Sequence, residues 1–358
     1  MKICILGSGL TALTLAKALV NQNIFVDIIA SNKKYKIHKF RTIGISKSNY
    51  EYFNKNIIKI EKIIWKLSNI QIYTDNIKNE KILNFERNKD QLFSIIRNYQ
   101  LYNILNKSLL KNKHFKKIKS KKKIVKLDKY NLILNTEYNN SYTRKYFSKK
   151  IEKSYDSSAF TTEIYHEKIS NNAAIQIFTK FGPLAFLPLS NSKTSIVYSI
   201  YNHKNITNEN ITKLIHRYNP KYEIKKIEKI ENFELKSFIV RSYYHNKILA
   251  FGDLLHRIHP LAGQGFNMTI RDINLLISII KKKIDLGLPI DSSINHEFEK
   301  KIKHKNYIFS NSIDLIHKFF NFERKLNNSI LTKSVKLLGK NPSINRIFTK
   351  IADEGLNF

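Results

Sequence analysis

At the start of the chain, the pattern of hydrophobic and polar residues changes from that of a strand to that of a helix and back. The run KICIL, residues 2–6, is almost wholly apolar, as in a strand buried on both faces. Residues 10–23, LTALTLAKALVNQN, place apolar side chains at helical spacing, and FVDIIA, residues 25–30, is a second apolar run. This strand–turn–helix–strand unit predicts the opening of a doubly wound α/β fold.

The next hundred residues alternate between helical and extended patterns. Residues 49–67 and 90–110 have helical periodicity, whereas IQIYTD, residues 70–75, alternates as a strand does. The run YNLILN, residues 130–135, predicts another buried strand. We interpret the basic run at residues 113–126, KHFKKIKSKKKIVK, as a solvated hairpin or loop.

The pattern changes near residue 155, where short alternating strands begin, separated by turn signals such as FGP and SNSK. Such strands predict a mainly antiparallel sheet inserted into the first domain. After the apolar run KILAF at residues 247–251, the chain is mostly helical. The predicted organisation is a discontinuous doubly wound (Rossmann-like) domain at 1–65, 85–150 and 246–290, a substrate-binding β-sheet domain at 66–84 and 151–245, and a C-terminal helical segment at 291–358.

Composition indicates a globular protein of 358 residues, of which 42% are hydrophobic. The single cysteine, Cys4, excludes a disulfide framework, and we expect it to be buried in a cytoplasmic protein. No signal peptide and no membrane-spanning apolar run are expected. The formal charge of +35 comes from lysines spread along the whole chain, without aromatic interleaving in the densest run, so nucleic acid is not the expected partner. Contact with anionic lipid remains open.

The turn after the first strand carries the motif GSGLTA, which includes Gly7, Gly9 and Ala12. In this position the glycines allow a tight turn and a close approach of the backbone to a pyrophosphate, and the alanine keeps the helix near the sheet. An acid usually ends the second strand and binds a ribose. Here that strand ends at Ala30, and Ser31 is a possible substitute.

A longer motif, GDLLHRIHPLAGQGFN, spans residues 252–267 between an apolar strand and a helical pattern. Asp253 can accept a hydrogen bond from a sugar hydroxyl, and Pro260, Gly263 and Gly265 shape a turn at a helix start, where backbone N–H groups favour anions. The amides of Gln264 and Asn267 can donate further hydrogen bonds.

This motif, followed by Arg271-Asp272, resembles the FAD-binding C-terminal motif of aromatic-ring hydroxylases. It closely resembles the corresponding segment of the ubiquinone-biosynthesis hydroxylases, which are relatives of para-hydroxybenzoate hydroxylase. The segments RTIGISKSNYEYF and FGPLAFLPL extend the resemblance. The implied cofactor-binding residues are Gly7, Gly9, Ala12, Arg41, Gly252, Asp253, Pro260, Gly263, Gln264, Gly265, Phe266 and Asn267. The implied substrate-pocket residues are Phe181, Gly182, Pro183, Leu184 and Leu187.

The resemblance implies an FAD-dependent monooxygenase that hydroxylates the aromatic ring of a lipophilic polyprenyl phenol or quinol in ubiquinone biosynthesis. NADH or NADPH would reduce the flavin, which would carry the oxygen as a C4a-hydroperoxide, so no protein side chain is assigned as catalytic. Three features depart from the family pattern: Glu137-Tyr138 replaces Asp-Gly, Ala30 replaces the acid, and Ile177 replaces an arginine. They leave open a non-catalytic flavin-binding subunit of a biosynthetic complex, or another flavin oxidoreductase.

His256 and His259 are spaced for a metal on a helix, but no carboxylate or thiol cluster accompanies them, so no metal is expected. Glu167 and Tyr155 are candidate substrate contacts. The C-terminal segment carries a helical apolar stripe that predicts either a packed amphipathic helix or a face for a partner protein or the inner surface of a membrane. The stripe consists of Phe309, Ile313, Ile316, Phe319 and Phe320.

Overall fold

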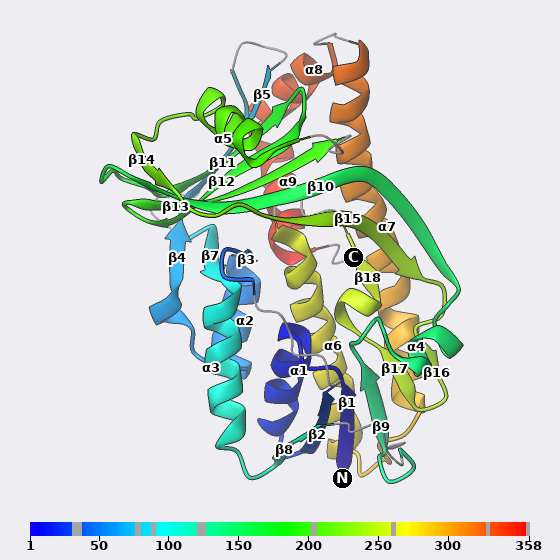
Figure 1. The fold of residues 1–358 in the computed structure, drawn as a ribbon. Helices are drawn as coiled ribbons and strands as arrows, with labels where there is room; N and C mark the ends of the chain where they lie inside the picture. Colours follow the sequence, from blue (N-terminus) through cyan, green and yellow to red (C-terminus); the bar gives the residue numbers. More distant parts are fainter. Residues whose placement is uncertain are drawn as a thin grey trace.

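The structure, a computed structural model, describes residues 1–30, 38–75, 80–86, 91–119, 127–201, 206–258, 263–326 and 330–355. Its strands form a parallel sheet, a small sheet and a large, mainly antiparallel sheet. Figure 1 shows the parallel sheet with its helices in the lower half and the large sheet lying across the top. This α/β architecture confirms the predicted fold class.

The parallel sheet contains both predicted N-terminal strands. Its order is β16 (Tyr244–His245), β17 (Ile248–Ala250), β9 (Leu132–Asn135), β1 (Lys2–Leu6), β2 (Phe25–Ala30) and β8 (Phe115–Lys119). All neighbours pair in parallel except β16 and β17, which pair antiparallel. β1 runs upward from the N-terminus in Figure 1, so the carboxyl ends of the parallel strands are directed toward the large sheet.

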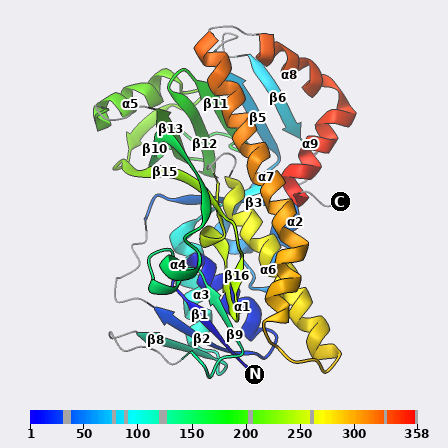
Figure 2. The ribbon, with the colours of Figure 1, turned by 90° about the vertical axis from the view of Figure 1, so that its right-hand side faces the viewer.

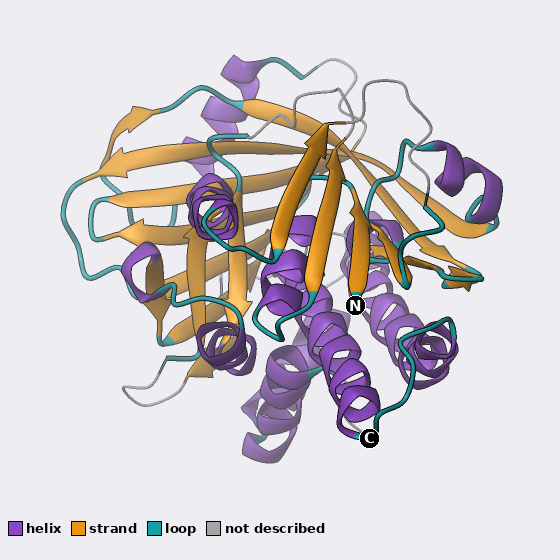
Figure 3. Cartoon of the chain, turned by 90° about the horizontal axis from the view of Figure 1, so that it is seen from below, coloured by secondary structure: helices purple, strands orange, loops and turns teal. Residues whose placement is uncertain are grey.

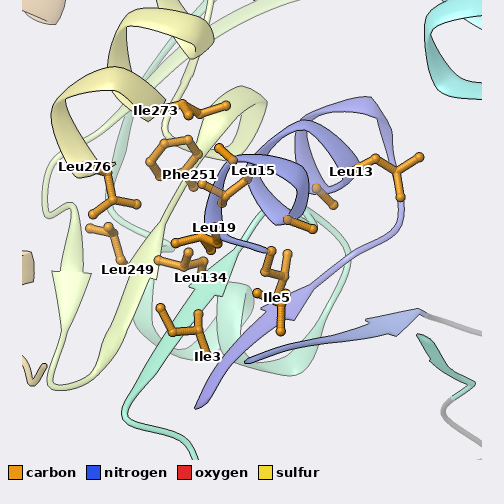
Figure 4. Close-up of a cluster of buried hydrophobic side chains, with 14 of the residues drawn as sticks. Ile3, Ile5, Leu13, Leu15, Leu19, Leu134, Leu249, Phe251, Ile273 and Leu276 are labelled. Atoms are coloured by element: carbon orange, nitrogen blue, oxygen red, sulfur yellow. The ribbon is translucent and has the colours of Figure 1, made fainter. Parts of the chain in front are cut away.

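Helices α1 (Leu10–Val20), α3 (Asn98–Leu110) and α6 (Gln264–Asp285) pack around this sheet, and the short α4 (Ser141–Tyr146) follows β9. Figure 4 shows the core that they enclose, in which Ile5 of β1 and Leu134 of β9 lie in register and face Leu15 and Leu19 of α1. Cys4 is buried here as expected, and burial raises the pKa of its thiol to about 12.

The small sheet corrects part of the predicted helices. It consists of β3 (Thr42–Ser46), β7 (Phe93–Arg97) and β4 (Ile64–Leu67). Helix α2 (Lys47–Asn56) follows β3, and the 3-10 turn η1 (Glu61–Ile63) precedes β4. The prediction of helices over 49–67 and 90–110 is wrong for the residues that form β4 and β7. Both strands are short apolar runs next to a helical pattern, and antiparallel pairing between β4 and β7 decides their conformation.

The basic run at 113–126 is not a solvated hairpin in its described part. Its first residues form β8, which pairs in parallel with β2 at the sheet edge. Lysines suit such an edge because they discourage pairing with another chain. Residues 120–126 lie outside the described part of the chain.

The large sheet runs across the direction of the parallel strands (Figures 1 and 3). Its order is β18 (His256–Arg257), β15 (Glu231–Val240), β10 (Lys150–His166), β13 (Lys193–Tyr201), β12 (Gly182–Ser190), β11 (Ala173–Thr179), β5 (Asn69–Thr74) and β6 (Lys81–Glu86), with β14 (Ile224–Ile227) paired to β10. Helix α5 (Asn208–Arg217) covers one face, and its apolar residues join a core with β10, β12 and β13. The other face is directed toward the parallel sheet.

The C-terminal segment is helical, as α7 (Ser293–Leu326), α8 (Ile330–Lys340) and α9 (Pro342–Glu354). Figure 2 shows α7 rising along the molecule, with α8 and α9 beside β6. In the described residues, no helix combines the length and the apolar character needed to cross a bilayer.

Candidate flavin site

The first glycine turn lies at the carboxyl edge of the parallel sheet. The Gly7 N–H donates to the Ile29 carbonyl at 3.0 Å, and Gly7 has a φ of +116°. A Cβ at Gly7 would lie 2.4 Å from Thr136 Oγ1, so the turn has no room for a side chain. Gly9 is the N-cap of α1 and provides no side-chain cap. The first-turn N–H groups of α1 are therefore left for a ligand at the sheet edge, and they favour an anion.

The predicted second loop meets this turn. The 3-10 turn η4 (Gly252–Leu254) follows β17, and Gly252 has a φ of +63°. A Cβ at Gly252 would lie 2.4 Å from Thr11 Cγ2 in the first turn of α1. The Asp253 side chain is exposed and has no hydrogen bond or ion pair with any residue in the described ranges. The fold thus places an available carboxylate beside the α1 N-terminus.

A second helix start faces the same region. Gly263, in the left-handed conformation, is the N-cap of α6 and makes no side-chain cap. A Cβ at Gly263 would lie 3.1 Å from the Gly44 nitrogen, so this turn packs closely on β3. Among the described residues, a Cβ at Gly265 would have only Ile258 within 4 Å, at 3.9 Å. Pro260 and His259 lie outside the described residues.

Asn267 has a different role from the one predicted. It is fully buried, and its amide donates to the carbonyls of Gly44 at 3.1 Å and Gly263 at 3.3 Å. Its Oδ1 accepts from the Ser46 N–H at 3.1 Å. With these groups engaged inside the protein, Asn267 fastens the α6 turn to β3 rather than donating to a ligand. The neighbouring Phe266 packs against Phe53 of α2, with ring centres 6.3 Å apart.

The remaining candidates at the sheet edge differ in availability. Asp27 is buried within β2, where it pairs with Lys2 at 2.7 Å and accepts from Tyr130 Oη at 2.6 Å, so it cannot serve a ribose. Ser31 lies outside the described residues.

Arg41 is exposed just before β3, with its guanidinium 5.6 Å from the Phe233 ring of β15. It therefore lies between the small and large sheets.

These features together fit FAD. Two adjacent helix N-termini can receive the pyrophosphate and the carbonyl edge of a flat ring, and Asp253 can accept from a sugar hydroxyl. Gly7, Gly252 and Gly263 shape the turns, while the fully buried Ala12 lets α1 pack closely. Gln264 is the first residue of α6 and is buried.

Strand register identifies which face of the large sheet lies over this site. Leu187, Ser195 and Glu163 are direct neighbours across β12, β13 and β10, so their side chains share a face. Arg97 of β7 makes two hydrogen bonds to Glu163, at 2.8 and 2.9 Å, and Thr42 bonds Ser195 at 3.0 Å. The hydrogen bonds to Glu163 raise the pKa of Arg97. This face is therefore the one opposed to the nucleotide domain.

The predicted pocket residues divide between the two faces. Because side chains alternate along a strand, Pro183 and Leu187 share the face of Glu163. Leu184 is fully buried in the core beside α5, and Phe181 packs against that same core. The structure therefore does not bring these two to the flavin side.

Gly182 has a φ of +135°, and a Cβ there would lie 2.1 Å from the Ser199 carbonyl, so its role is to permit strand pairing.

Val197 completes the flavin-side face but was not among the sequence candidates. It pairs in register with Ala185 and Thr161, is partly exposed, and lies between the rows of Leu187 and Pro183. The alternation of TSIVYSIY was a usable signal for this residue, because it separates Val197 from Ile196 and Tyr198, both buried in the α5 core.

The histidine candidate is part of a buried polar cluster. His256 Nε2 lies 2.7 Å from Asp272 Oδ2, and Asn306 donates to Asp272 Oδ1 at 3.2 Å. This arrangement joins β18, α6 and α7. Over the described residues, no group of three or more histidine, cysteine or acidic side chains is placed to hold a metal.

The other departures and candidates can also be placed. The Tyr138 ring lies against Phe238, with ring centres 5.3 Å apart, and its hydroxyl accepts from Lys150. Tyr155 donates to Asp314 of α7. Glu167 forms an exposed ion pair with Lys225, at the end of β10.

Parts of the chain are similar in sequence to known proteins. A family model described as an FAD binding domain matches residues 143–285. Ubiquinone biosynthesis monooxygenase COQ6 of Schizosaccharomyces pombe is 30% identical over 126 residues, covering 35% of this chain and 26% of that protein. The 3-demethoxyubiquinol 3-hydroxylase of Escherichia coli is 27% identical over 174 residues, covering 46% of this chain and 44% of that protein. The matched segments thus span less than half of each relative.

Solved structures share the whole fold. The p-nitrophenol 4-monooxygenase PnpA of Pseudomonas putida superposes with a TM-score of 0.78 and 11% identity, covering 97% of this chain and 96% of that one. HpxO of Klebsiella pneumoniae, complexed with FAD and uric acid, superposes with a TM-score of 0.75 and 11% identity. The match covers 99% of this chain and 97% of that one.

Residues 143–285 therefore resemble an FAD binding domain, and the whole chain has the fold of solved monooxygenases. Within that class, the relatives confirm the resemblance to the ubiquinone-biosynthesis hydroxylase family.

Proposed function

We propose that the protein is an FAD-dependent monooxygenase that hydroxylates the aromatic ring of a polyprenyl phenol or quinol in ubiquinone biosynthesis, with NADH or NADPH as electron donor. The observation that carries this proposal is the contact of Gly252 with Thr11, which joins the two loops of the resemblance at one sheet edge. The COQ6 and hydroxylase relatives support the substrate class.

The chain's own residues would bind and orient the reactants. The N-termini of α1 and α6 and the Asp253 carboxylate would hold FAD, which supplies the redox chemistry and oxygen activation when bound. Pro183, Leu187 and Val197 would hold the aromatic ring against the cofactor and exclude water from it. This face offers small and apolar surface, which suits a lipid-like phenol.

A pair of glycine variants tests the flavin site. Gly252→Ala places a Cβ against Thr11, whereas Gly287→Ala, at a similar φ of +65°, meets no atom of the described residues within 4 Å. We expect Gly252→Ala to lose the bound yellow flavin and Gly287→Ala to keep it, as measured by absorption of the purified proteins. Equal flavin content in the two variants would contradict the proposed site.

The competing function is a flavin-binding subunit without catalysis. Tyr138 in place of glycine and Ala30 in place of the acid favour it. Anaerobic reduction with NADH and NADPH, followed by oxygen uptake with a polyprenyl phenol, separates the two functions. The monooxygenase predicts rapid reduction and a hydroxylated ring, whereas a yellow protein that neither reductant bleaches supports the subunit. A deletion strain would accumulate the precursor and so identify the ring position.

We also propose that α7 contacts an anionic membrane surface, through a different face from the predicted one. Phe309 and Ile313 are buried, and Phe320 stacks on Phe178 with ring centres 3.6 Å apart, so much of the predicted stripe is core. The exposed apolar side chains of α7 include three that recur at about two-turn spacing: Tyr307, Leu315 and Phe322.

Cations lie beside this exposed stripe. Tyr307 borders an open groove whose lining includes the cations Arg241, Lys300 and Lys303 and the apolar Ile151 and Ile239. Glu299, an acid in this groove, pairs with Lys303 at 2.6 Å. Apolar side chains flanked by cations match an anionic lipid surface.

Vesicle flotation tests this surface. Tyr307→Ser/Leu315→Ser/Phe322→Ser should lower binding to phosphatidylglycerol vesicles by about tenfold, because insertion of apolar area is lost. Leu286→Ser/Leu288→Ser removes exposed apolar side chains elsewhere and should leave binding unchanged. Equal loss in both variants, or none in the first, would contradict the proposed face.

A further inference from the structure

The end of the C-terminal helix α9 reaches the start of α2, far away in sequence. The Ser48 N–H donates to Asp353 Oδ1 at 2.8 Å. The hydroxyls of Ser46 and Ser48 each donate to the Asp353 carbonyl at 2.9 Å. Asp353 is buried, so these bonds are shielded from water. The contact is therefore a specific polar junction between the two ends of the chain.

This junction replaces the usual helix cap. An N-cap serine normally accepts a hydrogen bond from an N–H in the first turn. Ser46 is the N-cap of α2 but makes no side-chain cap, because its hydroxyl is turned to the Asp353 carbonyl. The Asp353 carboxylate accepts from the first turn instead, and a negative charge there also complements the helix dipole. The start of α2 thus depends on a residue of α9.

The same residues connect to the flavin turn. The Ser46 N–H donates to Asn267 Oδ1, while the Asn267 amide donates to the carbonyls of Gly44 and Gly263. Gly263 is the left-handed residue that starts α6, and it packs directly on Gly44. A displacement of the β3–α2 junction would therefore move the groups that hold the α6 turn. Ser46 links Asp353 to Asn267, because it donates a hydrogen bond to each of them.

The end of α9 also covers a buried cation beside this turn. A Cβ at Gly355, the residue after α9, would lie 2.9 Å from Arg271 Nε. Burial lowers the pKa of Arg271 to about 10, and the charges of Asp272 and Asp353 oppose that effect. Within the described residues, Arg271 Nη1 has no hydrogen-bond partner. The docked position of Asp353 is therefore electrostatically favoured as well as hydrogen-bonded.

We propose that Asp353 is a positioning residue of the flavin site, which holds the β3–α2 junction and, through Ser46 and Asn267, the α6 turn in the geometry that binds FAD. This inference rests on the proposed binding of FAD at that turn. The role of Asp353 is to hold the β3–α2 junction through Ser46 and Ser48. The C-terminal helix thereby acts as a fixed support for a site built from the other end of the chain.

Titration of the full-length, deflavinated protein with FAD tests the proposal. Asp353→Ala should weaken the FAD Kd by about tenfold, because the first turn of α2 loses its cap. It should also change the visible circular dichroism of the bound flavin. Asp353→Asn keeps an oxygen acceptor for the Ser48 N–H and should restore Kd to within about threefold. The control Asn345→Ala removes a different anchor of α9, the bond from its amide to the Asn84 carbonyl at 3.0 Å.

A second variant removes the other partner of the same bond. Ser48→Pro deletes the N–H donor in the first turn of α2, where proline is tolerated. It should weaken FAD binding as Asp353→Ala does, and the double variant should be no weaker than either. Should Asp353→Ala fail to fold, Ser48→Pro and Asp353→Asn carry the test.

The outcomes separate the two proposals. A wild-type Kd and flavin spectrum in Asp353→Ala, or in Ser48→Pro, would overturn the positioning role while leaving FAD binding intact. An equal loss of affinity in Asn345→Ala would also overturn it, since any loosening of α9 would then suffice. A wild-type chain that binds no FAD would overturn the proposed function and this inference with it.

Discussion

The two faces of the large sheet are built from alternate residues of the same strands, yet they differ in side-chain size. The face toward α5 carries bulky residues that form a core, namely Phe160, Ile164, Leu184, Phe186, Ile196 and Tyr198. The face toward the nucleotide domain carries smaller residues in register, namely Ala159, Thr161, Ala185, Val197 and Ser199. One face is therefore filled by the large side chains around α5, and the other is the face on which we propose that the substrate lies.

The second face meets the small sheet through both apolar and polar contacts. Leu187 and Leu189 pack against a cluster that includes Leu67, Phe93 and Ile95. Arg97 and Glu163 form a buried ion pair between the small and large sheets, with Glu163 only 5% exposed. The proposed substrate site depends on this difference between the two faces.

The largest expected effect comes from breaking that ion pair. Arg97→Met should lower the free energy of unfolding by about 3–5 kcal/mol, because Glu163 would remain buried without its partner. Urea unfolding followed by tryptophan fluorescence measures the change. The double variant Arg97→Met/Glu163→Leu should recover most of the loss, since neither charge then remains buried. A stable single variant would show that other contacts hold the two layers.

A leucine from each face gives the next test. Leu184→Ala should cost about 3 kcal/mol of stability, because its fully buried side chain leaves a cavity in the α5 core. Leu187→Ala should cost about 1 kcal/mol, since this side chain is partly exposed, but should raise the KM for the aromatic substrate. Unfolding curves and steady-state kinetics measure the two quantities. The comparison fails if Leu184→Ala alters KM more than Leu187→Ala does.

The fold was predictable where periodicity within a segment decides the structure. The runs around Cys4 and FVDIIA are buried strands because both faces of a parallel sheet are covered, and the intervening helix has a clear period. The runs IWKL and FSIIR were predicted as helical because they adjoin helices. Their strand conformation comes from pairing with each other across an intervening segment. Local periodicity does not contain that information.

The site was predictable to the extent that glycine motifs report backbone geometry. Gly7, Gly252 and Gly263 each occupy positive φ and a close contact, as the motifs require. Asn267 was identified from its motif but assigned the wrong partner, because its neighbours on β3 are remote in sequence. Asp353 carries no motif, and its contact with Ser48 arises only when the two ends of the chain fold together.

A substitution on the face toward the nucleotide domain should affect turnover more than it affects stability. Val197→Phe would place a ring where the substrate is proposed to lie, and should lower kcat/KM by about tenfold or more. The FAD Kd should stay within about threefold, because Val197 is on the sheet and not on the glycine turns. Val197→Ala is the matched control and should retain most of the activity. Unchanged turnover in Val197→Phe would place the substrate elsewhere.

The smallest expected effect concerns a histidine on the filled side of the sheet. Burial lowers the pKa of His166, whose Nε2 lies 3.0 Å from Thr194 Oγ1. The unfolded chain, with an ordinary histidine pKa of about 6.5, then binds a proton that the folded chain does not, so His166 makes stability fall as pH drops below about 6.5. His166→Asn should be less stable at pH 8, where its ring contacts are missing, but its deficit should narrow between pH 7 and pH 5. Urea unfolding of both proteins across that range measures the difference. A constant deficit would mean that His166 accepts its proton equally well in the folded core, and that the filled face is less dry than its packing indicates.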